Sequence, residues 1–124
     1  MKISTIEAKY RRSGLHLKDS SLWSSLSKDN GWMEYFSKEL TISEKGIFGY
    51  FPEEDSAWLI TTSRIIIASG NKSESWPTKE FHAVDVPAML NGDLPKTHID
   101  CITLLGDRRS LSLKIELRSW PIVL

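Results

Sequence analysis

Three histidines, one cysteine and scattered carboxylates are the side chains of this chain that could bind a metal. A protein zinc site needs three or four ligands that face one point. His98 and Cys101 are three residues apart in an expected strand, so their side chains point to opposite faces. His98 and Asp100 do share a face, but neither His16 nor His82 is placed by the sequence to complete a set. We therefore expect polar groups on a solvated face, with no bound metal or cofactor.

Nucleophilic catalysis is equally weakly indicated. A catalytic cysteine needs a neighbouring base that forms the thiolate, whereas the strand face of Cys101 also carries Ile99, Thr103 and Leu105, which predicts a small buried apolar side chain. The chain has no Gly-x-Ser-x-Gly motif, and 69–73 lacks the glycine spacing of a phosphate-binding loop. We expect that the protein is not an enzyme. A small metal-dependent enzyme using His82, His98 and Asp100 is kept as an alternative.

The charge balance argues against a nucleic-acid partner. Sixteen basic residues balance sixteen acidic ones, so no overall field attracts DNA, RNA or anionic lipid. Local charge is found in two turns, the acidic Pro52-Glu53-Glu54-Asp55 and the basic pair Arg108 and Arg109. A solvated hairpin tip is the simpler interpretation of both turns.

Aromatic residues are the better indication of a binding surface. Trp23, Trp32, Tyr35 and Phe36 fall within two short expected helices, which cannot bury that much aromatic surface alone. They either complete the core or face a partner. Trp76, which follows a polar segment, is a candidate for the rim of the domain.

The elements that position these residues change character near residue 44. Ile6, Ala8 and Tyr10 alternate with polar residues, which predicts a short hairpin over 6–17. A short helix is expected after the Asp19-Ser20-Ser21 cluster as far as Asn30, and a second over 31–40. Strands are expected at 47–51, 57–61, 64–68, 79–86, 97–105 and 111–117, with solvated loops at 70–75 and 91–95.

Six short strands joined by tight turns favour a meandering antiparallel barrel or sandwich. With two N-terminal helices, the predicted class is α+β, in one domain over 1–124. Residues 1–42 would be a helical extension and 44–124 the barrel. The clearest strand is the last, in which Leu111, Leu113, Ile115 and Leu117 alternate with polar residues.

The segments 44–51, 58–67, 81–89 and 109–117 together resemble the pleckstrin-homology-like fold, most closely its bacterial and GRAM-type members. The segment 58–67 resembles the second hairpin of that family in its hydrophobic-Thr-x-x-Arg-hydrophobic pattern around Thr61 and Arg64, and the whole resemblance covers about two thirds of the chain. It implies a bacterial binding module. The family closes its barrel with a longer C-terminal helix, whereas few residues follow Ser119 here, so an open end would favour a partner or self-association.

Phosphoinositide binding in this family uses basic residues around the loop between the first two strands. That loop is acidic here, so we expect no such binding. The single cysteine excludes an internal disulfide, and no signal-like or membrane-spanning apolar run is present, so we expect a cytoplasmic location. We expect a protein or peptide partner, bound by strand addition or by a helix in a groove. An immunity-type inhibitor of a toxin is the alternative. The candidate partner-binding residues are Trp76, Arg108, Arg109, Trp23, Trp32, Glu53, Glu54 and Asp55.

Overall fold

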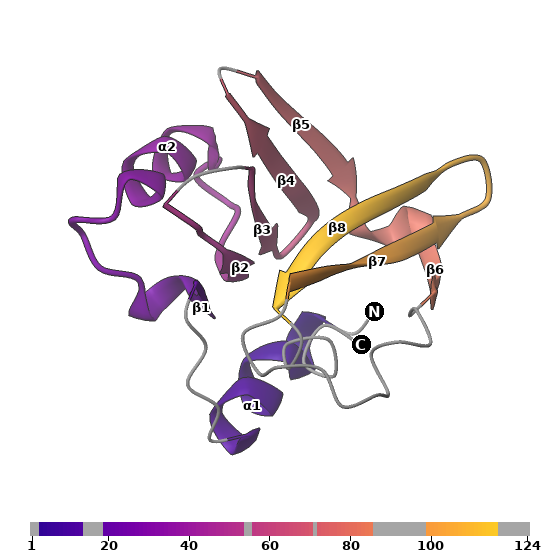
Figure 1. The fold of residues 1–124 in the computed structure, drawn as a ribbon, viewed down its shortest axis with the longest axis horizontal. Helices are drawn as coiled ribbons and strands as arrows, with labels where there is room; N and C mark the ends of the chain where they lie inside the picture. The colour runs from indigo at the N-terminus through magenta and orange to yellow at the C-terminus, as the bar shows by residue number, and fades with distance from the viewer. Residues whose placement is uncertain (1–2, 14–18, 54–55, 71, 86–98, 117–124) are drawn as a thin grey trace.

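The computed structural model describes residues 3–13, 19–53, 56–70, 72–85 and 99–116. Over these residues the chain combines helices with two antiparallel sheets, which confirms the α+β class (Figure 1). The helices are α1 (Ile3–Ser13) and α2 (Gly31–Glu39), with 3-10 turns η1 (Trp23–Ser25) and η2 (Thr78–Glu80). The strands are β1 (Ser20–Leu22), β2 (Gly46–Tyr50), β3 (Ala57–Thr61), β4 (Arg64–Ser69), β5 (Lys72–Pro77), β6 (Phe81–Asp85), β7 (Ile99–Gly106) and β8 (Ser110–Glu116).

The larger sheet has five strands in the order β1-β2-β3-β4-β5, each antiparallel to its neighbour. Its centre is the expected β3–β4 hairpin, in which Ile60 lies opposite Ile65 and a two-residue corner joins the strands. Consecutive β-branched residues suit strands that are buried on both faces. The predicted strands 47–51, 57–61 and 64–68 are therefore confirmed to within a residue at each end.

The smaller sheet has the order β6-β7-β8. Leu111, Leu113 and Ile115 of β8 are buried, and the intervening Ser112 is exposed, as the alternation predicted. On β7 the buried side chains are Ile102 and Leu104. On the other face of β7 Leu105 is exposed, and the side chain of Cys101, which was predicted to be buried on that face, lies outside the described part of the structure.

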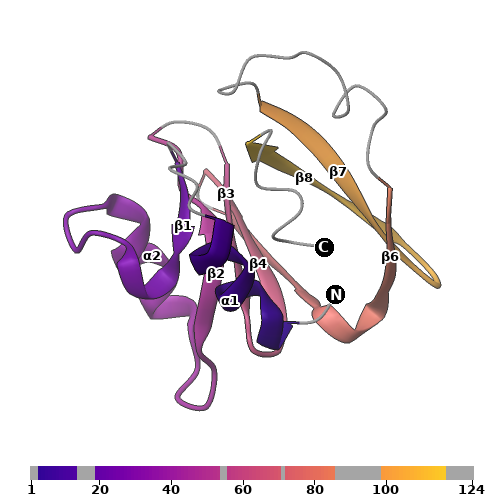
Figure 2. The same cartoon turned by 90° about the horizontal axis from the view of Figure 1, so that it is seen from below.

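The core lies in two layers, one on each face of the larger sheet. Alternate residues of β3 divide between them, since Trp58 and Ile60 face the smaller sheet while Ala57 and Leu59 face α2. Trp58 also ties the sheets together, because its indole Nε1 donates to the carbonyl oxygen of Lys114 over 2.6 Å. Figures 1 and 2 show α2 on the outer face of the larger sheet and α1 across one end of the space between the sheets.

The first helix is where the sequence prediction fails most clearly. Residues 3–13 form α1 and not one arm of a hairpin. Ile6 and Tyr10 lie four apart, so a helix places both on one face, where Ile6 is buried and Tyr10 packs on Phe48 with ring centroids 5.5 Å apart. Ala8, the residue that completed the apparent alternation, is exposed. Leu15 and Leu17 lie outside the described residues.

The helix expected after Asp19 is also wrong. Ser20–Leu22 is the short strand β1, which pairs with β2 so that Leu22 lies opposite Phe48, and only the 3-10 turn η1 follows. Pairing with an available sheet edge overrides a local capping signal here. The helix predicted over 31–40 is confirmed as α2, and the Asn30 side chain caps it by accepting from the Trp32 backbone N–H over 2.9 Å.

The segment expected to be a solvated loop at 70–75 contains most of β5 instead. Its side chains from Lys72 to Ser75 are exposed, yet its backbone pairs with the whole of β4. An edge strand needs no apolar face of its own when the neighbouring strand is buried, so the sequence lacks the alternation. The strand expected at 79–86 begins later, at Phe81, because η2 precedes it.

The described strands do not close into a barrel. They form two separate sheets, and the chain passes between them at η2. Figure 2 shows the sheets splayed in the manner of an open sandwich. The loop expected at 91–95 and the C-terminal residues 117–124, Leu117 included, lie outside the described residues.

Candidate functional site

The structure brings the candidate partner-binding residues together in two places and gives one of them a packing role. Trp76 meets Arg109 at the rim between the sheets, and Trp32 and Glu53 line one pocket at the N-terminal end of α2. Glu54 and Asp55 lie outside the described residues. Trp23 is used internally.

Trp23 is half-buried against the start of β2. Its ring meets Phe36 and Phe51, with centroid separations of 6.4 and 6.2 Å. A Cβ built on Gly46 would lie 2.6 Å from Cγ of Trp23, so the indole occupies the space that a side chain would need there. Trp23 is therefore a packing residue of the layer between α2 and the larger sheet.

At the rim, the Arg109 guanidinium carbon lies 3.7 Å from the centroid of the Trp76 ring. The same guanidinium donates to both carboxylate oxygens of Glu80, over 2.9 and 3.1 Å. Trp76 in turn stacks on Phe81, with centroids 6.1 Å apart. Glu80 was not among the predicted residues, and its position before an apolar residue carries no sequence signal of this pairing.

This rim group links three separate segments, the end of β5, η2 and the turn between β7 and β8. The Arg109 guanidinium stacks on Trp76 with its face and donates to Glu80 with its N–H groups. Arg109 therefore serves to hold the sheets together. Arg108 is exposed beside it and lines a shallow hollow with Asp107. Of the three predicted rim residues, Trp76 and Arg109 are thus engaged with each other, and Arg108 is exposed.

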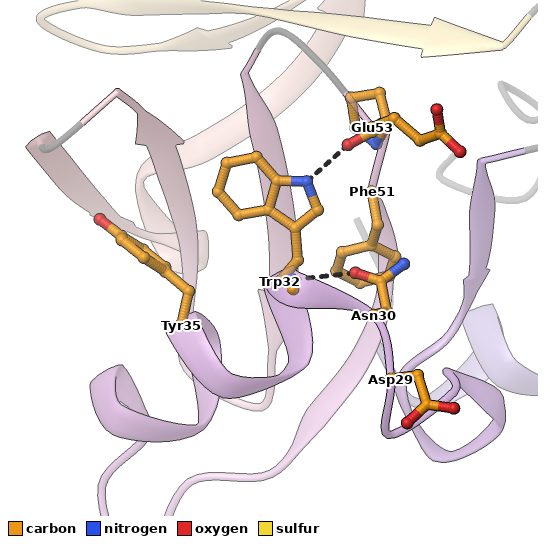
Figure 3. Close-up of a pocket in the computed structure, with 8 residues that line it drawn as sticks. Asp29, Asn30, Trp32, Tyr35, Phe51 and Glu53 are labelled. Carbon is orange, nitrogen blue, oxygen red and sulfur yellow. Dashed lines mark hydrogen bonds between the residues drawn. The ribbon is translucent and has the colours of Figure 1, made fainter.

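The second place is an open pocket of about 500 Å³, which we name the α2 pocket. The Trp32 indole stands in it, fixed by donation from Nε1 to the carbonyl oxygen of Pro52 over 2.6 Å. Tyr35 meets Trp32 edge to face, with centroids 5.7 Å apart. Figure 3 shows Trp32 and Tyr35 projecting from α2 beside one another. The pocket is lined by Asp29, Asn30, Gly31, Trp32, Tyr35, Phe51, Pro52 and Glu53.

The charge of the α2 pocket is negative. Asp29 and Glu53 are exposed, and Figure 3 shows Glu53 near the end of the Trp32 indole that bonds Pro52 and Asp29 farther away, below Asn30. The residues lining the pocket, all in the described part of the chain, include no Lys, Arg or His. The sequence indicated Trp32 and Glu53 separately, but only the contact of Trp32 with Pro52 brings them together.

A third cluster, missed by the sequence analysis, positions α2. Arg64 donates from Nε and Nη2 to the Glu44 carboxylate over 2.8 and 2.9 Å. Its Nη2 also donates to the carbonyl oxygen of Glu39, at the end of α2, over 2.7 Å. Thr61 and Ser63 donate their hydroxyls to the same carboxylate over 2.6 and 3.1 Å. The only sequence signal of this cluster was the turn pattern at Thr61 and Arg64, which does not indicate that Glu44 is the acidic partner.

The Glu44 carboxylate is 2% exposed, and the Arg64 hydrogen bonds lower its pKa from 4.5 to about 2 against the opposing effect of burial. Glu44 in turn raises the pKa of Arg64. The pair is therefore ionised at neutral pH. Its partners are all structural, so the cluster acts as a clamp between α2 and the β3–β4 corner.

The candidate metal ligands are not assembled in the described part of the structure. His82 is exposed, with Nε2 3.3 Å from Oδ1 of Asp107. His16 and His98 lie outside the described residues, as do the side chains of Asp100 and Cys101. Among the residues that the structure does describe, no group of three or more His, Cys, Asp or Glu is close enough to hold an ion.

In comparisons with known proteins, no family model, curated sequence or solved structure matches this chain. Within the described residues, neither α1 nor α2 has the length and apolar character needed to cross a membrane.

Proposed function

We propose that this chain is a non-catalytic binding module that takes a protein or peptide partner at the α2 pocket. The proposal depends on one observation. Trp32 and Tyr35 line the same open pocket as the exposed carboxylates of Asp29 and Glu53. Aromatic side chains held rigidly in a partly enclosed pocket are where binding energy concentrates in protein interfaces. The clamp formed by Arg64 and the bond from Trp32 to Pro52 hold this surface in place before a partner arrives.

Insertion of a side chain of the partner into the α2 pocket is favoured over strand addition at β5. The exposed positions of β5 include Lys72 and Glu74, and charged edge strands discourage pairing with another chain. The α2 pocket instead offers apolar surface with polar groups at its margin, which is typical of ligand sites.

The pleckstrin-homology-like resemblance is part of the proposal. It is supported by the consecutive antiparallel order of β2 to β5, followed by that of β6 to β8. The separation of the two sheets leaves room for the partner to complete the domain. The cytoplasmic location, the bacterial origin and self-association stay predictions.

The alternative is an immunity-type inhibitor that neutralises a toxin. One observation favours it, namely that Glu53 is exposed at the margin of the α2 pocket, where it could meet a basic surface. Replacing Glu53, Glu54 and Asp55 together with Ser should abolish binding to a basic toxin. Unchanged affinity would exclude this version.

The binding-module proposal is tested by selecting peptides from a random twelve-residue library on the full chain. Selected peptides should lose affinity for Trp32→Ala by about tenfold or more, because interface tryptophans are frequent hot spots. Ser75→Ala, an exposed position on β5, is the control and should bind as the unmodified chain does.

The thermal midpoint of each variant is recorded first, so that loss of binding is not confused with loss of folding. Trp32→Phe serves as the milder variant if Trp32→Ala is unfolded. Peptides that bind equally well to the Trp32 variants would contradict the proposed pocket, and a failure to select any peptide would contradict the proposed function.

A further inference from the structure

The rim group shows how this chain itself holds a guanidinium. Arg109 is stacked on the Trp76 ring at 3.7 Å while the Glu80 carboxylate takes two of its hydrogen bonds. The planar guanidinium is suited to this combination, because its face attracts the aromatic π-system while its edge matches a carboxylate. An aromatic ring and a carboxylate at the same place are therefore the two parts of an arginine site.

The α2 pocket holds the same two parts without a basic side chain among its described lining residues. Trp32 and Tyr35 supply the rings, and Asp29 and Glu53 supply the carboxylates. Neither carboxylate is engaged in an ion pair with a described residue. We propose that the α2 pocket receives an arginine side chain of the protein or peptide partner, an inference that rests on the proposed function.

The electrostatics of the helix end partly oppose this assignment. The N-terminus of α2 lies in the pocket, and a helix dipole places roughly half a positive charge there, which disfavours a cation. Asn30 already satisfies the Trp32 backbone N–H. Two full carboxylate charges outweigh the remaining half charge, so the net field of the described lining residues favours a cation.

Arginine is preferred to lysine for geometric reasons. A compact ammonium is strongly hydrated and makes point contacts, whereas a guanidinium stacks on a ring and still donates sideways. Asp29 and Glu53 line the same pocket as the Trp32 indole, so a guanidinium bound there has both a ring and carboxylates among its surroundings. The Trp76 group shows this arrangement elsewhere in the chain.

The test is a nuclear magnetic resonance titration of the full ¹⁵N-labelled chain with N-acetyl-arginine amide. The readout is the indole N–H signal of Trp32, identified by its absence in Trp32→Phe. We expect this signal to shift with saturation. N-acetyl-citrulline amide, which has nearly the same shape without the charge, should bind about threefold to tenfold more weakly.

Charge variants make the assignment specific. Asp29→Asn with Glu53→Gln should weaken arginine-amide binding about threefold to tenfold, since both side chains are exposed and their replacement leaves the fold unchanged. The matched control is Glu34→Gln with Glu74→Gln, which changes net charge equally at two exposed positions outside the pocket lining. Binding to the control should be unchanged.

Equal binding of citrulline and arginine amides, or insensitivity to the Asp29 and Glu53 changes, would overturn the inference. The peptide selection separates this failure from failure of the proposed function. Peptides that bind at Trp32 with arginine at an anchor position support both statements. Peptides that bind at Trp32 without a basic anchor support the module and overturn the arginine assignment.

Discussion

Arg64 and Glu44 are joined by two hydrogen bonds of 2.8 and 2.9 Å across the corner of the β3–β4 hairpin. The Glu44 side chain is 2% exposed, so the ion pair is largely removed from water. Removing one member of such a pair is costly, because the other is left without its partner. The same Arg64 bonds the end of α2 through Glu39. This contact makes the position of α2, and hence of the α2 pocket, depend on an ion pair at its far end.

The lowered pKa of Glu44 predicts an acid-sensitive contribution to stability. Its pKa is about 2 in the folded protein and about 4.5 in the unfolded chain, so the unfolded chain binds more protons in that interval. The contribution, up to about 3 kcal/mol, is complete above pH 4.5 and is lost as pH falls toward 2. Urea denaturation at stepped pH should show Glu44→Gln converging on the unmodified chain at the acid end. A stability difference that stays constant with pH would contradict this.

Trp58 is predicted to stabilise the contact between the sheets through its indole hydrogen bond as well as through its buried apolar surface. Trp58→Phe removes the 2.6 Å bond from Nε1 to the Lys114 carbonyl oxygen and some buried apolar surface. We expect a loss of about 2–4 kcal/mol in the free energy of unfolding, measured by urea denaturation. Phe48→Leu trims apolar volume from the same core layer and leaves the bond intact, so it should cost less. A larger loss for Phe48→Leu would show that packing alone matters at this position.

The rim group should show a measurable coupling between its ring and its cation. In a double-mutant cycle with Arg109→Gln and Trp76→Leu, we expect a coupling energy of about 0.5–1 kcal/mol, because the stacked pair is partly exposed. The free energies come from thermal or urea unfolding of the four proteins. Additive effects of the two substitutions would mean that the 3.7 Å contact stabilises nothing.

Two glycines should respond differently to the same added methyl group. Gly46→Ala would place a Cβ 2.6 Å from Trp23 Cγ, so the indole must move, and we expect a loss of about 1–3 kcal/mol. Gly31→Ala meets no atom within 4 Å and lies at the first position of α2, so stability should be unchanged or raised by up to about 1 kcal/mol. Thermal midpoints of both variants give the comparison. A neutral Gly46→Ala would mean that Trp23 moves freely.

Local sequence patterns were sufficient to predict the elements that bury one or both of their faces in the core. The β3–β4 hairpin, β8 and α2 were predicted because their apolar residues recur with the period of the element that they form. The β5 strand escaped prediction because its stability lies in backbone bonds to β4, which side-chain patterns do not report. The α1 helix escaped prediction because the spacing of Ile6 and Tyr10 fits both the helical and the strand period. Only the packing of Tyr10 on Phe48 distinguishes the helix.

Patterns along the chain were therefore enough to predict the α+β class, the central hairpin and the identity of several rim residues, since these depend on neighbours close along the chain. They could not pair Glu44 with Arg64, Arg109 with Glu80, or Trp32 with Glu53. Each pair spans about twenty residues or more, and charge or aromatic character alone does not name a distant partner. The tertiary structure decided those pairings, because the order of strands in each sheet and the packing of α2 bring the segments together.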